Sequence, residues 1–294
     1  MATTDAFCTA CSWSSQRQEA CCYHSHVKLD YAVSDRGVWS VGSRMVIKER
    51  STKPPNFEAA ALGFIRSNTA IPVPGIIKDW TEEPDRYFLA MDRVPGEPLT
   101  KIWPGMSELD RHRIAEQAAG HLAELRSLQS PRLESLGNQP LYSAFLFRNG
   151  YGLPHGPFTS DDQLWEEMAK ALPWLSEKAS GRLRKRMPPA APYTFTHGDL
   201  STDNIIIQDG NISGIIDWEA SGYFPAWWES TALTIVQSDY DREWKLLLRK
   251  HMEEHIKEHL DAHKFWSDYY ALSMYPSLNE RGEGLLRELE AGEE

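Results

Sequence analysis

The sequence lacks a long apolar run, and no stretch of its 294 residues stays hydrophobic long enough to cross a bilayer as a helix. Its N-terminus, MATTDAFCTACSWSSQRQ, also lacks the charged-then-apolar pattern of a secretory signal. We therefore expect a cytoplasmic protein without a membrane partner. A basic excess is missing too, because the formal net charge is −11, which argues against a nucleic-acid partner.

Cysteine is absent after residue 22. The first 29 residues form a tail in which four cysteines and two histidines follow the pattern C-x2-C-x9-C-C-x-H-x-H: Cys8, Cys11, Cys21, Cys22, His24 and His26. Thiolates and imidazoles at such short spacing can close a tetrahedron around zinc, although only the first pair has a typical spacing. The alternative is a flexible tail with reduced thiols, and the sequence leaves both interpretations open.

The region before residue 95 is predicted to contain a small sheet and one helix. Residues 37–50 read as two strands around a Gly42-Ser43 turn. Residues 56–68 place apolar side chains on one side of a helix, which the following prolines end. Two further strands are expected at 75–80 and 86–94, joined by the turn-like sequence TEEPD.

The region after a linker at 95–99 is predicted to be mainly helical, with an aromatic and glycine-rich loop at 140–160. Helices are expected at 107–128, capped by Ser107, at 160–175, and over most of 226–291. Strands followed by helices, with one hairpin between them, favour an α+β fold. We place its two lobes at residues 30–94 and 95–294.

The segment THGDLSTDNIIIQDGNISGIIDWE, residues 196–219, places polar side chains around two apolar strands. Its turn, Asp209-Gly210-Asn211, predicts a hairpin. Because the two ends of a hairpin lie side by side, Asn204 and Asp217 should converge, with Asp199 on the preceding loop. Oxygen ligands of this kind suit Mg²⁺, which takes few protein ligands together with substrate phosphates.

The order H-x-D-x4-N followed by a later Asp is that of the kinase catalytic apparatus. Gly198 stands where protein kinases have Arg, and Trp218-Glu219 stand where they have Phe-Gly. With these differences the segment resembles the aminoglycoside phosphotransferase and choline kinase family of small-molecule kinases, and is most similar to its fungal members. Four upstream motifs extend the resemblance over roughly residues 30–260: MVIK (45–48), FEAAALGFI (57–65), IPVP (71–74) and LAMDRVPGEPL (89–99).

The resemblance implies a role for each residue of the hairpin segment. Asp199 is expected to be the catalytic base for the acceptor hydroxyl, and His197 to orient the catalytic loop. Asn204 and Asp217 are expected to hold Mg²⁺, which neutralises the β- and γ-phosphate oxygens of ATP.

The resemblance also assigns the nucleotide contacts of the first lobe. Lys48 is expected to contact the α- and β-phosphates, held in place by Glu58. No G-x-G-x-x-G loop precedes Lys48, so the backbone of residues 34–43, including Ser43, is expected to surround the phosphates. The hinge, whose backbone would bind adenine, comprises Met91, Asp92 and Val94.

Together these residues imply a two-lobed protein-kinase-like fold that transfers the γ-phosphoryl group of ATP to a hydroxyl of a small molecule, with Mg²⁺. The alternative is a pseudokinase that binds a nucleotide or small molecule without turnover, although no residue of the set is missing. A metal-dependent phosphohydrolase is a third class, but it would not need the Lys48–Glu58 pair.

The acceptor is predicted less directly. Glu219, Trp228 and Glu229 combine carboxylates with an indole, which suits a cationic, hydroxyl-bearing acceptor through charge and cation–π contact. The alternative is that the tryptophans belong to the core and the acids to a solvated face. The sequence does not decide between the two.

Four histidines recur at every fourth residue of a predicted helix: His251, His255, His259 and His263. A pair at i and i+4 can bind zinc only with a third ligand. The polar edge of an amphipathic helix is therefore the favoured interpretation.

Overall fold

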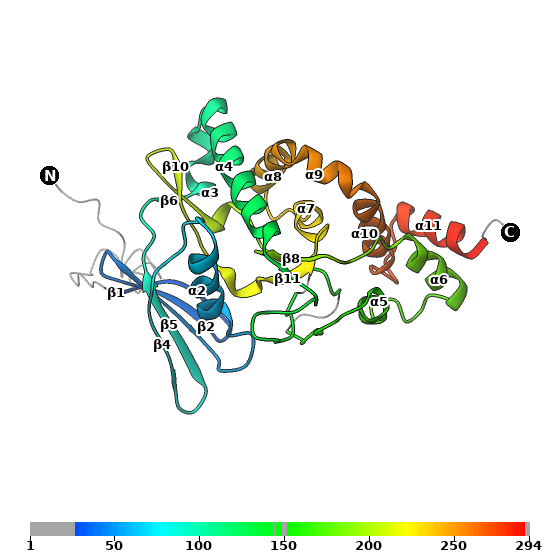
Figure 1. The fold of residues 1–294 in the computed structure, drawn as a ribbon, viewed down its shortest axis with the longest axis horizontal. Coiled ribbons are helices and arrows are strands. Elements are labelled where there is room, and N and C mark those ends of the chain that lie inside the picture. The colour runs from blue at the N-terminus through cyan, green and yellow to red at the C-terminus, as the bar shows by residue number, and fades with distance from the viewer. Residues whose placement is uncertain (1–26, 144, 149–151, 292–294) are drawn as a thin grey trace, which may run out of the picture.

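The computed structural model describes residues 27–143, 145–148 and 152–291, which form an N-terminal part built on a sheet and a mainly helical C-terminal part (Figure 1). Among these residues no helix is long and apolar enough to cross a membrane. The cysteines and histidines of the tail lie outside the described residues, so zinc binding there stays a prediction.

Five antiparallel strands form the N-terminal sheet, in the order β1-β2-β3-β5-β4. The hairpin predicted around Gly42-Ser43 is confirmed as β2–β3, and the two later strands as β4–β5. The bounds are β1 (Val27–Val33), β2 (Arg36–Val41), β3 (Met45–Arg50), β4 (Ile76–Glu82) and β5 (Arg86–Asp92). Because β3 is central, Lys48 is fixed by pairing with Val38 on one side and Leu89 on the other.

The helix predicted at 56–68 is confirmed as α2 (Glu58–Asn68). Its apolar side chains, Ala61, Leu62 and Ile65, are fully buried, which fixes the helix. Glu58 stands in the first turn of α2, and its carboxylate is buried as well. The helix therefore presents one acid to the interior.

The linker at 95–99 contains a two-residue strand, β6 (Glu97–Pro98), which pairs with the hairpin predicted in the second lobe. That hairpin is confirmed as β9 (Ile205–Gln208) and β10 (Asn211–Ile215), with Ile215 opposite Ile205. At its open end the Ile216 N–H donates to the Asn204 carbonyl oxygen at 2.9 Å. The backbones before Asp217 and at Asn204 therefore converge as expected.

Short elements complete the frame around this hairpin. The helix predicted from 107 is α4, where Ser107 Oγ accepts the Asp110 N–H at 3.1 Å, which is the expected N-cap. A three-stranded sheet in the order β11-β8-β7 carries the chain into and out of the hairpin segment. The bounds are α3 (Leu99–Ile102), η1 (Trp103–Gly105), α4 (Glu108–Ser127), β7 (Gln129–Ser130), β8 (Tyr193–Thr196), η2 (Thr202–Asn204), η3 (Trp218–Ala220) and β11 (Gly222–Pro225).

The remaining helices follow the prediction for 226–291 and differ from it between 160 and 192. The helix expected at 160–175 ends at Ala169, because Pro173 disfavours helical backbone before it. A further helix at 177–186 was not predicted, since its only buried side chains are Ala179 and Leu183. The bounds are α5 (Asp161–Ala169), α6 (Glu177–Arg186), α7 (Trp228–Ala232), α8 (Asp239–His251), α9 (Glu253–Glu258), α10 (Leu260–Leu272) and α11 (Glu280–Ala291).

The prediction that one helix carries all four histidines is wrong. The chain breaks at Met252 and again at His259, so His251 ends α8, His255 lies in α9 and His263 in α10. The regular spacing of the four residues therefore does not place them on one helix face.

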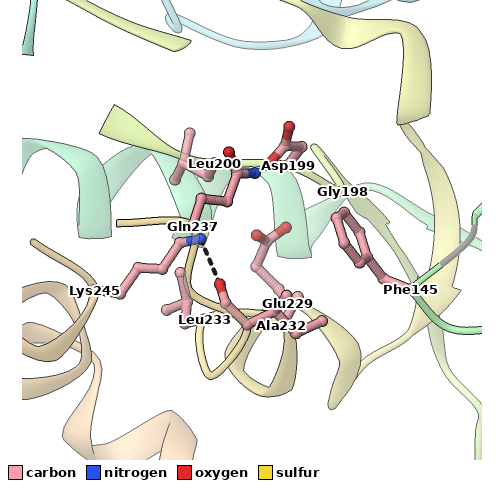
Figure 2. A pocket seen from close by; sticks show the side chains of 10 residues that line it. Phe145, Gly198, Asp199, Leu200, Glu229, Ala232, Leu233, Gln237 and Lys245 are labelled. Atoms are coloured by element: carbon pink, nitrogen blue, oxygen red, sulfur yellow. Dashed lines mark hydrogen bonds between the residues drawn. The ribbon is translucent and has the colours of Figure 1, made fainter. Parts of the chain in front are cut away.

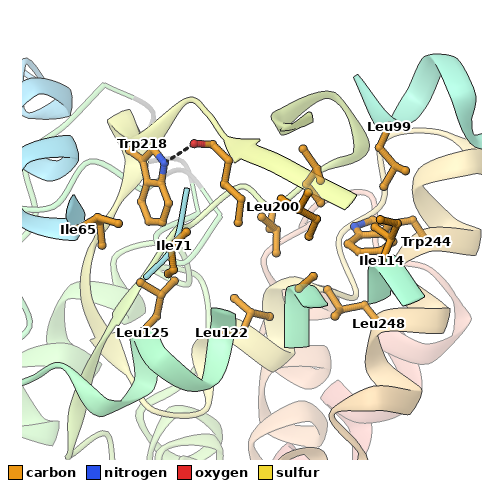
Figure 3. Close-up of a cluster of buried hydrophobic side chains, with 14 of the residues drawn as sticks. Ile65, Ile71, Leu99, Ile114, Leu122, Leu125, Leu200, Trp218, Trp244 and Leu248 are labelled. Carbon is orange, nitrogen blue, oxygen red and sulfur yellow. Dashed lines mark hydrogen bonds between the residues drawn. The ribbon is translucent and has the colours of Figure 1, made fainter. Parts of the chain in front are cut away.

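Two buried apolar clusters hold these elements together. The first joins α2 and β5 to the hairpin, α4 and α8, and Figure 3 shows Trp218 within it, donating its indole N–H to the Ile215 carbonyl oxygen at 2.9 Å. The second joins α5, α6, α7, α10 and α11. Because the first cluster includes residues on both sides of the linker, it positions the hairpin against the N-terminal sheet.

The burial pattern of α4 generates the first prediction. Ile114 is fully buried in the first cluster, whereas Leu109 on the same helix is 76% exposed. Ile114→Ala should lower the free energy of unfolding by about 2–5 kcal/mol through the cavity it leaves. Leu109→Ala is the matched control and should change it by less than about 0.5 kcal/mol. Urea unfolding measures both, and equal effects would contradict this assignment of the core.

Candidate active site

The centre of the site is an ammonium group held between two carboxylates. Lys48 Nζ on β3 lies 2.6 and 2.8 Å from the two oxygens of Glu58 on α2, and 2.6 Å from Asp217 Oδ1 at the end of β10. Burial alone would lower the pKa of Lys48, but the two carboxylates outweigh it and raise that pKa above its usual value. Lys48 is therefore a permanent cation that joins three elements.

Asp217 takes its position from an unusual backbone. Its φ is 65°, in the left-handed region, two residues after the end of β10 and directly before η3. The next residue, Trp218, is held in place because its buried indole N–H donates to the Ile215 carbonyl oxygen. The backbone therefore turns the Asp217 carboxylate toward β3.

His197 connects the catalytic loop to the hairpin. Its Nε2–H donates to the Ile216 carbonyl oxygen at 2.9 Å, and its Nδ1 accepts the Asp199 N–H at 3.2 Å. The ring is fully buried, and burial lowers the pKa of His197 to about 4. A neutral imidazole with a hydrogen bond at each ring nitrogen positions its neighbours and does not exchange protons at neutral pH.

A steric constraint explains why glycine, and not the arginine of protein kinases, occupies position 198. Gly198 has φ +88°, and a Cβ there would lie 2.7 Å from the Ala220 carbonyl oxygen. A side chain such as Arg would therefore displace the loop that carries Asp199.

Asp199 is half-buried, and Figure 2 shows it with Gln237 and Lys245 around a small cavity of about 10 Å³. Gln237 Nε2 donates to Asp199 Oδ1 at 3.0 Å. Burial raises the pKa of Asp199 to about 6, opposed by Lys245 and assisted by nearby acids, Asp217 first among them. Gln237 was not predicted, since nothing in the sequence before α8 marks it.

Asn204 offers one oxygen next to Asp217. Its Nδ2 donates to the Asp199 carbonyl oxygen at 2.8 Å, which leaves Oδ1 as the atom that could bind a cation. Asp217 engages Lys48 through Oδ1 and has a second carboxylate oxygen. One amide and one carboxylate oxygen form a hard donor set, which fits Mg²⁺ bound together with phosphates.

A second group of acids, Glu58, Asp217 and Glu219, also brings carboxylate oxygens within 4.8 Å of one another. Protein cations already neutralise these acids, because Lys48 lies between the first two and two arginines bind the third. Asn204 with Asp217 therefore remains the better-fitting pair for a metal.

A cavity of about 630 Å³ lies between the sheet and the hairpin. Lys48, Asn204 and Asp217 line it, as do the expected hinge residues Met91, Asp92 and Val94. The Asp92 N–H already donates to the Gly75 carbonyl oxygen, and the Arg93 N–H to that of Arg44. Met91 lies inside β5, between β3 and β4, which leaves Val94 as the expected hinge residue beyond these contacts.

The structure does not place Ser43 with the phosphate-binding groups. It lies in the exposed β2–β3 turn, five residues from Lys48, which is about 16 Å along an extended strand. The β1–β2 turn approaches the cavity instead, since Arg36 and Gly37 line it. The expectation for Ser43 is therefore corrected, because the turn that carries it is at the other end of β2.

A second cavity, of about 410 Å³, adjoins the first and is lined by both Asp199 and Asp217. Glu219 lies between the two cavities, where its oxygens accept from Arg36 Nη1 at 2.5 Å and Arg50 Nη1 at 2.7 Å. Neither arginine was predicted. Arg50 could have been found, because it lies two residues beyond Lys48 and so on the same face of β3.

The other two residues proposed for the acceptor do not line this cavity. Trp228 is fully buried in the second apolar cluster, so its ring cannot stack on a ligand in either large cavity. Glu229 is buried behind the loop, where it accepts the His197 N–H at 3.2 Å. The stacking role predicted for Trp228 is therefore corrected in favour of the core.

His255, Glu258 and His259 have ligand atoms within 4.8 Å of one another. All three come from a single helical turn, where residues at i, i+3 and i+4 always lie close. Arg126 lines the same hollow, and its positive charge opposes a bound cation. A metal site there gains no further support.

The fold and the site together define a kinase-like phosphotransferase architecture. The sequence matches the phosphotransferase enzyme family (APH) over residues 38–266, and the chain belongs to this family. An aminoglycoside 3′-phosphotransferase of Enterococcus faecalis is 33% identical over 69 residues. That match spans 24% of this chain and only 25% of the relative.

Solved structures of aminoglycoside phosphotransferases share the fold. ADP-bound APH(2″)-Ib has a TM-score of 0.56 at 14% identity, covering 90% of this chain and 91% of its own. The streptomycin–ATP complex of APH(2″)-IIa gives 0.55 at 15%, covering 100% and 98%. A thermostable mutant of APH(4)-Ia with AMP-PNP and hygromycin B gives 0.56 at 14%, covering 91% and 95%.

The buried position of Glu229 generates a pH prediction. Burial raises the pKa of Glu229 to about 7, although the His197 amide and the Arg126 cation oppose it. Its contribution to stability is therefore full below the unfolded-state pKa of about 4.3 and is lost as pH rises through 7. Glu229→Gln removes this loss, so its stability relative to the native chain should rise by on the order of 2 kcal/mol from pH 5 to pH 8.

Urea unfolding at several pH values measures this difference. The control is Glu254→Gln, on the exposed side of α9, which should follow the native chain at every pH. A difference between Glu229→Gln and the native chain that stays constant from pH 5 to pH 8 would contradict the account of Glu229.

Proposed function

We propose that the protein transfers the γ-phosphoryl group of ATP to a hydroxyl of a small molecule, with Mg²⁺. The supporting observation is the meeting of Lys48 on β3 with Asp199 and Asp217, from the two ends of the hairpin segment, where two cavities adjoin. A donor in one cavity and an acceptor in the other would meet at these residues. Phosphoryl transfer depends mainly on such positioning and on charge neutralisation.

The 630 Å³ cavity is the proposed nucleotide site. Lys48 would bind phosphate oxygens with its three ammonium donors, held in direction by Glu58. Val94 would offer the backbone amide for the adenine. The proposed nucleotide lobe is residues 30–94, and residues 95–294 would supply the loop and hairpin. Related structures holding ATP, ADP or AMP-PNP support a nucleotide donor.

Mg²⁺ would be held by Asn204 Oδ1 and Asp217, and when bound it would neutralise charge on the phosphate oxygens. Asp217 has a further role through its ion pair with Lys48, since that pair fixes the ammonium at the edge of the same cavity. Asn204 fixes the catalytic loop through its bond to the Asp199 carbonyl.

Asp199 is the proposed base. The acceptor oxygen bonds to the γ-phosphorus, its proton passes to the Asp199 carboxylate, and the bond to the bridging oxygen of ADP breaks. A pKa of about 6 leaves this carboxylate ionised at neutral pH and close to the value that favours proton exchange. His197 and Gln237 would hold the base in place, one through its backbone and one through Oδ1.

The related structures with streptomycin, gentamicin or hygromycin B support a small acceptor that bears hydroxyl groups. Identity to these proteins is near 14–15%, so their particular acceptors do not transfer to this chain. Antibiotic modification is therefore not part of the proposal.

The test is ADP release with Mg²⁺·ATP over a panel of sugars, cyclitols, hydroxy acids and amino alcohols. Asp199→Asn keeps the shape of the side chain and should lower kcat roughly 10²–10⁴-fold. The matched control is Asp239→Asn, at the exposed start of α8, which should keep native turnover. Unchanged turnover in Asp199→Asn would overturn the proposal, whereas nucleotide binding without turnover of any acceptor would indicate a pseudokinase.

A further inference from the structure

The 410 Å³ cavity is where the acceptor would meet Asp199, and cationic side chains line it together with the acids. Its charged lining among the described residues comprises three cations and four acids. The cations are Arg36, Arg50 and Lys53, and the acids are Asp35, Asp199, Asp217 and Glu219. Two of the four acids have another partner or role, since Asp217 pairs with Lys48 and Asp199 is the proposed base.

Glu219 is already committed to the protein. One of its oxygens accepts from Arg36 Nη1 and the other from Arg50 Nη1, at 2.5 and 2.7 Å. A guanidinium carries five N–H donors, and this bond to Glu219 uses one of those of Arg50. The side chain of Arg50 is only 11% exposed, so a ligand anion would find a partly desolvated guanidinium.

The cations continue in one direction along the sheet. Lys48 and Arg50 lie two residues apart on the same face of β3, about 7 Å from each other along the strand. Lys48 faces the proposed nucleotide cavity only, Arg50 lines both cavities, and Lys53 lines the second cavity only. Positive charge thus extends past the transfer point to the acceptor side.

The rest of the lining is apolar or hydroxylic. Tyr142 and Phe145 form one wall with Pro54 and Pro55, and Ser51 and Ser143 add hydroxyl groups. Such a wall suits a ring or short apolar body.

We propose, on the basis of the phosphotransferase function above, that the acceptor is a small hydroxyl compound bearing an anionic group, bound by Arg50 and Lys53. The anion would lie away from Asp199, so that a hydroxyl on the other side of the molecule faces the base. A carboxylate and a phosphate share the chemistry that guanidinium and ammonium groups recognise.

Four cyclohexane polyols of similar size test the charge directly: quinate, myo-inositol 1-phosphate, neutral myo-inositol and the diamine 2-deoxystreptamine. ADP release should favour at least one anion over the neutral compound and the diamine by about tenfold or more in kcat/KM. The two anionic arms separate a carboxylate from a phosphate preference. Binding is read in parallel as the thermal shift that each compound adds to the protein saturated with Mg²⁺·AMP-PNP.

Lys53→Glu is the decisive variant, because Lys53 is exposed and lines only the second cavity. It should raise KM for the preferred anion about tenfold and leave KM for ATP unchanged. Lys185→Glu, on the exposed surface of α6, is the charge-matched control and should behave like the native chain.

Preference for the neutral compound or the diamine, equal thermal shifts for all four, or an unchanged anion KM in Lys53→Glu would each overturn the proposal. Failure of the phosphotransferase function itself looks different. In that case Mg²⁺·ATP gives no thermal shift and ADP is not released with any acceptor, whatever its charge.

Discussion

The ion pair between Lys48 and Asp217 joins two parts of the chain that are 169 residues apart, and the arrangement of the site depends on it. Glu58 completes the group from α2, so that one ammonium fixes β3, α2 and the end of β10 together. An unpaired buried ammonium would be costly, which makes the three-way contact self-consistent. The buried cluster around Trp218 and Ile65 supplies the rigid support beneath it.

A second level of ion pairs repeats this arrangement two residues further along both segments. Arg50 follows Lys48 on β3 and Glu219 follows Asp217 after the hairpin, and the two later residues also bind each other. In the first pair, Lys48 lines only the proposed nucleotide cavity. In the second pair, both Arg50 and Glu219 line both cavities. The charge that an acceptor meets is therefore set by residues that also hold the two parts of the fold together.

Much of this organisation could be predicted from the sequence, because local patterns carry it. β-Branched residues and a Gly-Ser turn identify β2 and β3, and the Asp-Gly turn identifies the hairpin whose ends bring Asn204 and Asp217 near each other. Residues whose position depends on distant contacts could not be predicted. The side chain of Gln237 reaches Asp199 only through the fold, and Trp228 is buried by helices far along the chain. Ser43 lies in the turn at the end of β2 opposite to the β1–β2 turn that approaches the cavity.

The most direct test of the central claim is the thermal stability of the protein with ATP, with and without Mg²⁺. A ligand that binds only the folded chain raises its melting temperature by mass action. If Asp217 and Asn204 complete a nucleotide site, the native chain should shift only when Mg²⁺ and ATP are both present, and Asp217→Asn should lose the shift. An equal shift in Asp217→Asn, or none in the native chain, would contradict the account.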